Sequence, residues 1–493
     1  MPSLPKFALL LLAAGTSVAA AQGVRGANDL PDIGTPADTA LTLSDEHQIG
    51  LMIVRGLRDQ GQILEDPELN DYIQSLGMRL AAQTPDGGHS FYFFIVRDPR
   101  INAFALPGGF IGVNQGLMVA AANEAQLASV LAHEISHVTQ RHIARSIKAQ
   151  GRQSMASAAA ILAAILIGAT TGAGDAVQAG IAIAQGTAAQ QRINFTRANE
   201  YEADRVGIGV LAAAGFDPNA MPDFFETIGR RAGLGGSQVP EFLQTHPVTS
   251  NRIAESRERA AQFVRTAVPE SPTYEFARER VRVVGAPADS DLRPYYAAKR
   301  EQRMLRPGEL YGEAIALQRA GQAAAAVGSL RELAGRSEGL PILQSALGEA
   351  LMTANREDEA LATFAQALRV APRNVPLSVR YAEALMRAGK PKQAHELLLD
   401  VFNNVPPSPD QIRLTALAAS AAGDTGDAYY YMSEYHIASG DLTLASKQLE
   451  LALAAPNLTG VQRARFEARL KEIRDFLAEQ PQRSARKDAD TIG

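Results

Sequence analysis

The feature that most constrains the fold of this chain is a regular repeat in its C-terminal part. One column of the repeat, spaced by 34 residues, contains Gly321, Asn355, Gly389 and Gly423. An alanine follows five positions later in each unit, and a large apolar residue follows nine positions later, at Leu330, Phe364, Leu398 and Met432. Half a unit further on, the same offsets recur at Gly440, Ala445 and Leu449. A period of this length predicts stacked helical hairpins.

A 34-residue helix-turn-helix unit with small residues where helices touch is the tetratricopeptide pattern. Pro372 and Pro406 supply the helix-ending residue expected in such units. An unrelated alanine-rich bundle would not hold a fixed period. Residues 308–480 are therefore predicted to form a tetratricopeptide solenoid, followed by a polar tail over 481–493. Because such solenoids bind other polypeptides, this part of the chain favours binding and not chemistry.

The composition excludes several classes of protein and of site. At 493 residues the chain is long enough for about two to four domains. It contains no cysteine, which excludes disulfides and thiolate ligands, so any metal must be held by histidines and carboxylates. A net charge of −5 gives no reason to expect nucleic acid as a partner.

The first 21 residues have the order of a secretory signal peptide. Lys6 precedes the apolar run Phe7 to Ala14, and small residues follow up to Ala21. The run is too short to span the hydrocarbon core of about 30 Å, which argues against a membrane anchor. We expect cleavage after Ala21. Because the chain is predicted to be exported and has no disulfides, we expect it to be located in a bacterial periplasm.

Between residues 22 and 268 the sequence predicts a mainly α domain with a small β-sheet. Apolar periodicity indicates helices at 45–60, 66–83, 124–148 and 199–214. Aromatic and β-branched runs indicate strands at 90–97, 101–106 and 110–114. A Pro-Gly-Gly turn joins the last two strands into a pair. The stretch 269–307 contains several prolines and many charges, and we interpret it as a linker to the solenoid.

The motif that indicates chemistry is His133-Glu134-Ile135-Ser136-His137, inside the helix predicted over 124–148. Its two histidines are four residues apart and share one helix face, so both imidazoles can bind one zinc ion. Glu134 then lies beside a water that the zinc activates, and takes its proton as the water attacks a peptide carbonyl. The alternative is a helix with two surface histidines, which a third ligand would argue against.

Ile143 stands where the metzincin arrangement has a third histidine, and His142 misses that register. We interpret His142 as a group behind the ligands or at the surface. The better third ligand is Glu200, which lies one turn before Asp204 on the helix predicted over 199–214. Glu200 completes a two-histidine, one-carboxylate site that leaves the fourth position for water. Asp204 can orient a ligand histidine through its second ring nitrogen.

These motifs, together with Asn102-Ala103-Phe104-Ala105-Leu106-Pro107-Gly108-Gly109, resemble the HtpX-related zinc metallopeptidases. The signal peptide and the tetratricopeptide array make the chain similar to the BepA type within that group. The resemblance implies a gluzincin-like fold in which one zinc ion is bound by His133, His137 and Glu200, with Glu134 as the catalytic base. It also implies an edge strand over 102–109, where an extended substrate adds as a further strand along Asn102, Ala103, Phe104 and Ala105.

His246 and Arg252 lie in the segment Thr245-His246-Pro247-Val248-Thr249-Ser250-Asn251-Arg252. By itself, a lone histidine before proline is most often a solvated loop residue. The resemblance implies that this His-Pro and the arginine after it lie near the metal. His246 would then donate to the oxyanion of the tetrahedral intermediate, or occupy the open zinc position and inhibit the resting enzyme. Arg252 would bind a substrate carbonyl or brace the loop.

An uncharged segment over 153–174 raises the alternative of a membrane span. A single span would place His133 and Glu200 on opposite sides of the membrane, so they could not share one zinc ion. A hairpin would need a second span, and 176–190 is short and contains several glutamines. We therefore interpret residues 153–190 as a mobile apolar cover near the active site, open to contact with the membrane surface or the substrate, and a membrane hairpin stays the alternative.

Together, the residues and the resemblance predict an exported zinc endopeptidase that acts in quality control and assembly of outer-membrane β-barrel proteins. Its substrates would be unfolded or stalled barrel proteins, and the array would dock on the assembly machinery or on the client. Two alternatives stay open: a chaperone or scaffold whose zinc site is structural or permanently inhibited, and a general protease of misfolded periplasmic proteins. Glu134 favours an enzyme, because a purely structural site needs no general base beside the metal.

Overall fold

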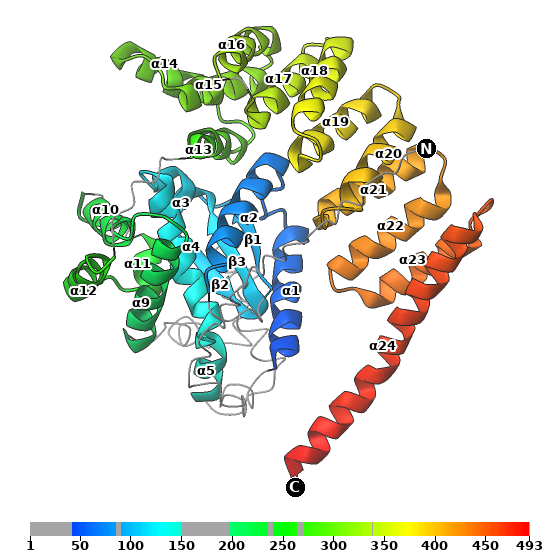
Figure 1. Cartoon of the computed structure of the whole chain (residues 1–493), viewed down its shortest axis with the longest axis horizontal. Coiled ribbons are helices and arrows are strands. Elements are labelled where there is room, and N and C mark those ends of the chain that lie inside the picture. The colour runs from blue at the N-terminus through cyan, green and yellow to red at the C-terminus, as the bar shows by residue number, and fades with distance from the viewer. Residues whose placement is uncertain are drawn as a thin grey trace, which may run out of the picture.

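The computed structural model describes residues 42–84, 90–149, 197–234, 240–263, 271–337 and 339–492. They form a mixed N-terminal part and a long curved row of helical hairpins that runs beside it (Figure 1). The predicted fold class is confirmed: a mainly helical domain with a small sheet is followed by helical repeats.

Two predictions fall outside the described residues, namely the signal peptide over 1–21 and the apolar cover over 153–190. Among the residues that are described, no helix combines the length and the apolar character needed to cross a membrane.

Helices make up most of the N-terminal part, and its strands follow one another in one short stretch. In chain order the elements are α1 (Leu43–Asp59), α2 (Pro67–Ala81), β1 (Tyr92–Val96), β2 (Ala103–Leu106), the 3-10 turn η1 (Pro107–Gly109), β3 (Phe110–Asn114), α3 (Gln115–Ala120), α4 (Glu124–Thr139), α5 (His142–Ala149), α9 (Arg197–Ala213), α10 (Ala220–Leu234), α11 (Glu241–Thr245) and α12 (Ser250–Ala260). The helices predicted at 45–60, 66–83 and 199–214 and the three predicted strands are confirmed to within a few residues.

The sheet separates two apolar cores, because successive residues of a strand point to opposite faces. Phe93 and Ile95 of β1 lie in the larger core, with side chains from α2, α4, α9 and α10. Phe94 and Val96, the residues between and after them, lie in a smaller core that α1 covers. The aromatic and β-branched run that predicted this strand is therefore buried on both faces.

The strand order is β1–β3–β2, so β2 lies at an edge of the sheet in the part of the chain that is described. β2 pairs antiparallel with β3, with Ala103 opposite Val113, which confirms the predicted strand pair. The turn between them requires glycine, because Gly108 and Gly109 have φ angles of 78° and 85°.

The single helix predicted over 124–148 is wrong in its second half. α4 ends at Thr139 and α5 begins at His142. Between them Arg141 has a φ of 51°, a left-handed conformation that interrupts a helix. An ion pair of 2.7 Å with Glu46 of α1 holds Arg141 in place. A contact between distant segments thus redirects the chain where local periodicity predicts continuation.

The remaining helices form the row of hairpins and its connection to the N-terminal part. They are α13 (Pro272–Val284), α14 (Arg293–Gln302), α15 (Pro307–Arg319), α16 (Ala323–Arg336), α17 (Pro341–Thr353), α18 (Glu357–Val370), α19 (Val375–Arg387), α20 (Pro391–Phe402), α21 (Pro409–Ala421), α22 (Thr425–Ala438), α23 (Leu442–Ala454) and α24 (Gly460–Ile492). The stretch 269–307, interpreted as a linker, contains α13 and α14, and α24 extends into the polar tail. The domain limits at 22–268 and 308–480 stay predictions.

The 34-residue column has a physical cause in this row. The four residues of the column follow the first helix of successive hairpins and have φ angles of 78°, 57°, 67° and 85°, at Gly321, Asn355, Gly389 and Gly423. Glycine, and less readily asparagine, adopts this left-handed conformation at low cost and so ends a helix. The alanine column lies at helix contacts, where three of its members are fully buried, Ala326, Ala360 and Ala394. The predicted helical hairpins are confirmed.

α13 joins the two parts, because its side chains pack into two different cores. Tyr274, Ala277 and Val281 lie in the larger core of the N-terminal part. Phe276 and Val283 lie in the core of the helical row. The connection is therefore an ordered helix that contributes apolar side chains to both cores.

A buried set of charges also fixes the row to the N-terminal part. We call it the interdomain charge cluster; it consists of Asp66, Glu68, Arg280, Glu349 and Arg380. Arg280 Nε lies 2.7 Å from Asp66 Oδ1, and Arg280 Nη2 lies 3.0 Å from Glu68 Oε2. Arg380 Nη2 of α19 lies 2.9 Å from both Asp66 Oδ2 and Glu68 Oε2. Burial opposes ionisation of Glu68, but the two guanidinium groups outweigh it and hold its pKa well below the usual range.

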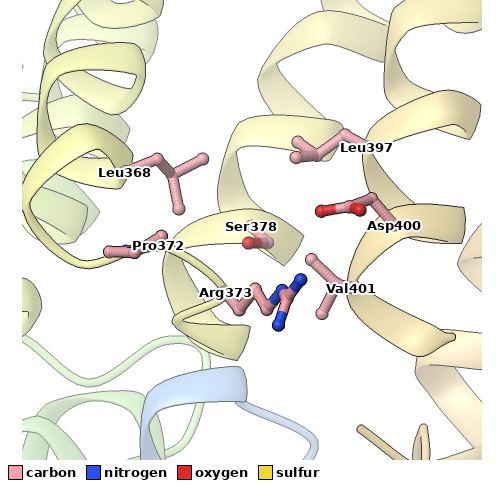
Figure 2. Close-up of a pocket in the computed structure, with 7 residues that line it drawn as sticks. All are labelled: Leu368, Pro372, Arg373, Ser378, Leu397, Asp400 and Val401. Carbon is pink, nitrogen blue, oxygen red and sulfur yellow. The ribbon is translucent and has the colours of Figure 1, made fainter. Parts of the chain in front are cut away.

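A cavity of about 580 Å³ opens between α18, α19 and α20 (Figure 2). Leu368, Leu397 and Val401 give it apolar walls, and Arg373 and Asp400 place one charge of each sign at its side. Helices of the row alone form this cavity, so it does not depend on the contact with the N-terminal part.

Removing one cation of the interdomain charge cluster should destabilise the protein strongly. Arg280→Ala leaves Asp66 and Glu68 short of a partner in a buried site, which costs about 3–5 kcal/mol of unfolding free energy. Arg331→Ala is the control, because Arg331 and Glu359 are half exposed and such pairs contribute about 0–1 kcal/mol. Chemical denaturation followed by circular dichroism measures both losses. If both variants lose a similar, small amount of unfolding free energy, the cluster does not stabilise the protein as we predict.

Candidate metal centre

α4 brings His133 and His137 to one buried point, because neighbouring elements enclose the whole helix. It packs against β2, α2, α9 and α10. α9 comes especially close at Gly207, where a Cβ atom would lie 3.2 Å from the backbone of Ala132. A larger residue at that position would push the two helices apart. The close approach brings Glu200, two turns earlier in α9, to the histidines.

Four side chains converge at this point: His133, His137, Glu200 and His246. One nitrogen or oxygen from each lies within 4.8 Å of all the others, and each residue is at most 2% exposed. The Nε2 atoms of the two α4 histidines are 3.0 Å apart, and they lie 3.6 and 3.5 Å from the oxygens of Glu200. Ligand atoms around a tetrahedral zinc ion with bonds of about 2.0–2.1 Å are roughly 3.3 Å apart. The separations therefore fit one zinc ion.

The charge of this set also fits a divalent cation. Glu134, Glu200 and Asp204 are buried carboxylates, and Arg252 is the guanidinium that contacts two of them. Buried negative charge is costly unless it is compensated. Burial and the neighbouring His133 lower the pKa of His137, so its ring is neutral, the form that binds metal. A divalent cation would balance the charge that remains.

Asp204 and Arg252 hold the ligand groups in position. Asp204 Oδ1 lies 3.0 Å from His133 Nδ1, which leaves His133 Nε2 directed at the cluster. Burial lowers the pKa of His133, but hydrogen bonds to Asp204 and Glu200 outweigh it and raise the pKa to about 10, so this ring carries a proton that a metal at Nε2 would displace. Arg252 reaches Asp204 through two nitrogens and Glu200 through a third, each at 2.8 Å. It also donates to the carbonyl of Pro247 in the loop that follows His246.

His246 follows α11 and lies inside the cluster. Its Nδ1 is 3.0 Å from Glu200 Oε1 and 3.4 Å from His133 Nε2. Its Nε2 is 3.5 Å from Glu134 Oε1. The ring of Phe242 lies 4.9 Å from the imidazole and supports it from α11. His246 is therefore a buried residue at the centre of the site, and not the solvated loop residue that local sequence alone would suggest.

Glu134 lies beside the four converging side chains with its carboxyl group fully buried. Neither carboxyl oxygen makes a hydrogen bond of good geometry with a described residue. Burial raises the pKa of Glu134, and His246 and His133 oppose this only in part. A buried carboxyl group that is free to accept a proton is what a general base requires.

The edge strand runs past this carboxyl group. β2 packs against α4, and the backbone of Ala105 lies close enough to affect the pKa of Glu134. Ala103 is buried, Phe104 and Ala105 are half-buried, and Asn102 just before the strand is buried. The four residues expected to bind substrate thus lie in β2 and directly before it, beside the predicted base.

The sequence predicts His142 as a group behind the ligands or at the surface, and the structure places it directly behind His137. The two Nδ1 atoms are 2.8 Å apart, and His142 Nε2 is 3.1 Å from Glu202 Oε2. The only signal in the sequence is a histidine five positions after the second histidine of the motif. That spacing does not share a helix face, so it does not predict the contact.

Comparison with known proteins decides the family. Residues 67–260 match the model of Peptidase family M48, and residues 356–419 match that of a tetratricopeptide repeat. The beta-barrel assembly-enhancing protease of Escherichia coli (strain K12) is 35% identical over 458 residues, which cover 91% of this chain and 92% of that protein. The chain belongs to the beta-barrel assembly-enhancing proteases of peptidase family M48.

Two further relatives support this assignment to the family. The beta-barrel assembly-enhancing protease of Yersinia pestis is 33% identical over 94% of this chain and 96% of that protein. A relative from Vibrio cholerae is 43% identical over 293 residues, which cover 58% of this chain and 59% of that protein. The family is metal-dependent, and the chain is a metalloendopeptidase, as predicted. The roles of individual residues stay predictions.

If Glu200 is a ligand, Glu200→Ala should lose tightly bound zinc. Loss of a direct ligand weakens binding by more than the roughly 10–100-fold that supporting residues contribute. Glu255→Ala, on the exposed side of α12, is the control and should keep the zinc content of the wild type. Atomic emission spectrometry of the purified proteins measures zinc per chain. Stoichiometric zinc and full activity in Glu200→Ala would refute the assignment.

Proposed function

We propose that this chain is an exported zinc endopeptidase that acts in the quality control and assembly of outer-membrane β-barrel proteins. The observation that carries the proposal is the buried carboxyl group of Glu134 beside a four-residue metal cluster and an edge strand. The names of the relatives supply the substrate class. In this proposal the peptidase domain covers 22–268 and the array covers 308–480.

His133, His137 and Glu200 would hold one zinc ion, which supplies a lowered pKa for a water in the fourth position. Glu134 would accept a proton from the attacking water and deliver it to the leaving amine. Asp204 fixes His133 so that its Nε2 faces the metal. Arg252 keeps Glu200 and Asp204 ionised and in place, and acts as a brace for the His246 loop.

An extended substrate would pair with β2. Its backbone would bond to the edge of β2 that pairs with no other described strand, which would hold the scissile carbonyl in line with Glu134 without reading side chains. Backbone pairing of this kind suits unfolded chains of varied sequence. A folded barrel has its strand edges paired already, so it should resist cleavage.

His246 is proposed to inhibit the resting enzyme. Its imidazole lies between Glu200 and Glu134, where it would occupy the position that a water needs. Movement of the loop after α11 would open that position, and the imidazole could then donate to the oxyanion. Inhibition and donation to the oxyanion are therefore alternative roles for His246, and the second requires the loop to move.

The periplasm is the proposed location, on the basis of the signal peptide with cleavage after Ala21. The array would dock on the outer-membrane assembly machinery or on the client, since tetratricopeptide solenoids bind polypeptides. A second candidate function is that of a chaperone with a closed zinc site. The position of His246 supports it, and Glu134 supports the peptidase.

Cleavage of an unfolded β-barrel protein by the mature chain, residues 22–493, tests the proposed function. Glu134→Gln should keep zinc and cut about 10²–10⁴-fold more slowly, because it cannot accept the proton. The same barrel protein in its folded form is the substrate control and should stay intact. If Glu134→Gln cuts as fast as the wild type, the assigned mechanism fails. If both proteins hold zinc and neither cuts the substrate, the result favours the chaperone function over the peptidase function.

His246→Ala separates the two roles of that residue. If His246 inhibits the resting enzyme, the variant should cleave the unfolded substrate several-fold faster than the wild type, with unchanged zinc content. His436→Ala, in α22 of the array, is the matched control and should have no effect. A large loss of cleavage in His246→Ala would contradict inhibition and favour an oxyanion role.

A further inference from the structure

His142 is a buried residue that has no role in the zinc site as described above. Its side chain is fully shielded from solvent at the start of α5. Its Nδ1 lies 2.8 Å from Nδ1 of His137, and its Nε2 lies 3.1 Å from Oε2 of Glu202. Arg145 Nη1 holds the same oxygen of Glu202 at 3.1 Å. A row of polar groups therefore leads from a proposed zinc ligand to the surface.

The order of protons along this row follows from the position of the metal. His137 Nε2 faces the cluster, 3.0 Å from His133 Nε2. A metal there takes the lone pair of Nε2, so the neutral ring carries its proton on Nδ1. That proton can be donated to His142 only if His142 Nδ1 is an acceptor. His142 then carries its own proton on Nε2 and donates it to the carboxylate of Glu202.

The chain is bent so that this contact can form. In an uninterrupted α-helix, a residue five positions on lies about 140° around the axis, so His142 would face away from His137. The left-handed Arg141, with a φ of 51°, breaks the helix between them. Its ion pair with Glu46 fixes the break. The first turn of α5 then returns the imidazole of His142 to the back of His137.

We propose that His142 is the positioning residue of His137, and that Glu202 is the anion that fixes the tautomer of His142. Asp204 orients His133 directly, whereas the carboxylate of Glu202 orients His137 through an intervening imidazole. This arrangement keeps Nε2 of His137 directed at the metal and raises the basicity of that nitrogen. The inference rests on the proposed zinc site.

Zinc affinity of the full mature chain, measured by competition with a chelator, tests the inference without any peptidase assay. His142→Phe keeps a ring of similar size and removes both nitrogens, so zinc binding should weaken by about 10–100-fold. His142→Gln is the rescue variant, because its amide oxygen can accept from His137 and its amide nitrogen can donate to Glu202. It should recover most of the affinity. The absorption spectrum of the cobalt(II)-substituted protein should change in His142→Phe and return in His142→Gln.

Glu202→Ala covers the case in which His142→Phe does not fold. Glu202 is partly exposed, so its removal leaves the core intact while the anion is lost. We expect zinc affinity to fall by about 10-fold, at the low end of the range for supporting residues. Wild-type zinc affinity in either His142→Phe or Glu202→Ala would overturn the inference. If the wild-type protein itself binds neither zinc nor cobalt, the proposed zinc site fails instead, and the two failures are distinguishable.

Discussion

The rest of the structure depends on gathering buried carboxylates and imidazoles at one point between α4 and α9. A buried carboxylate is costly unless a cation or hydrogen-bond donors compensate it. The chain meets this need by placing the guanidinium of Arg252 between Glu200 and Asp204. It places both on a helix that Gly207 allows to approach α4 closely. Burial in the same enclosure raises the pKa of Glu134 above its ordinary value.

The second organising contact is the attachment of the array to the peptidase. α13 contributes to both apolar cores, and the interdomain charge cluster ties the first residues of α2 to α17 and α19. A further ion pair joins Arg55 of α1 to Asp441, at the turn between α22 and α23. In the described part of the chain the array therefore contacts the peptidase both at α2 and at α1, and Figure 1 shows it curving past these two helices. A partner that binds the array would act on a unit that is already joined to the catalytic part.

Regular spacing accounts for most of what the sequence could predict. The 34-residue column marks positions with positive φ, which is a backbone requirement visible in residue type. The two histidines of the motif share a helix face for a similar local reason. Contacts between distant segments could not be predicted. Arg141 leaves the helical conformation where it pairs with Glu46, 95 positions earlier, and this break is what places His142 behind His137. Arg280 looks like a solvated linker residue, yet it is buried against acidic partners of α2.

The most direct test of the account is a crystal structure of the purified mature chain with diffraction data collected at the zinc absorption edge. We predict one strong anomalous peak per chain, about 2.0–2.1 Å from the Nε2 atoms of His133 and His137 and from an oxygen of Glu200. A peak bound by other residues, or no zinc peak in a protein that cleaves its substrate, would contradict the account.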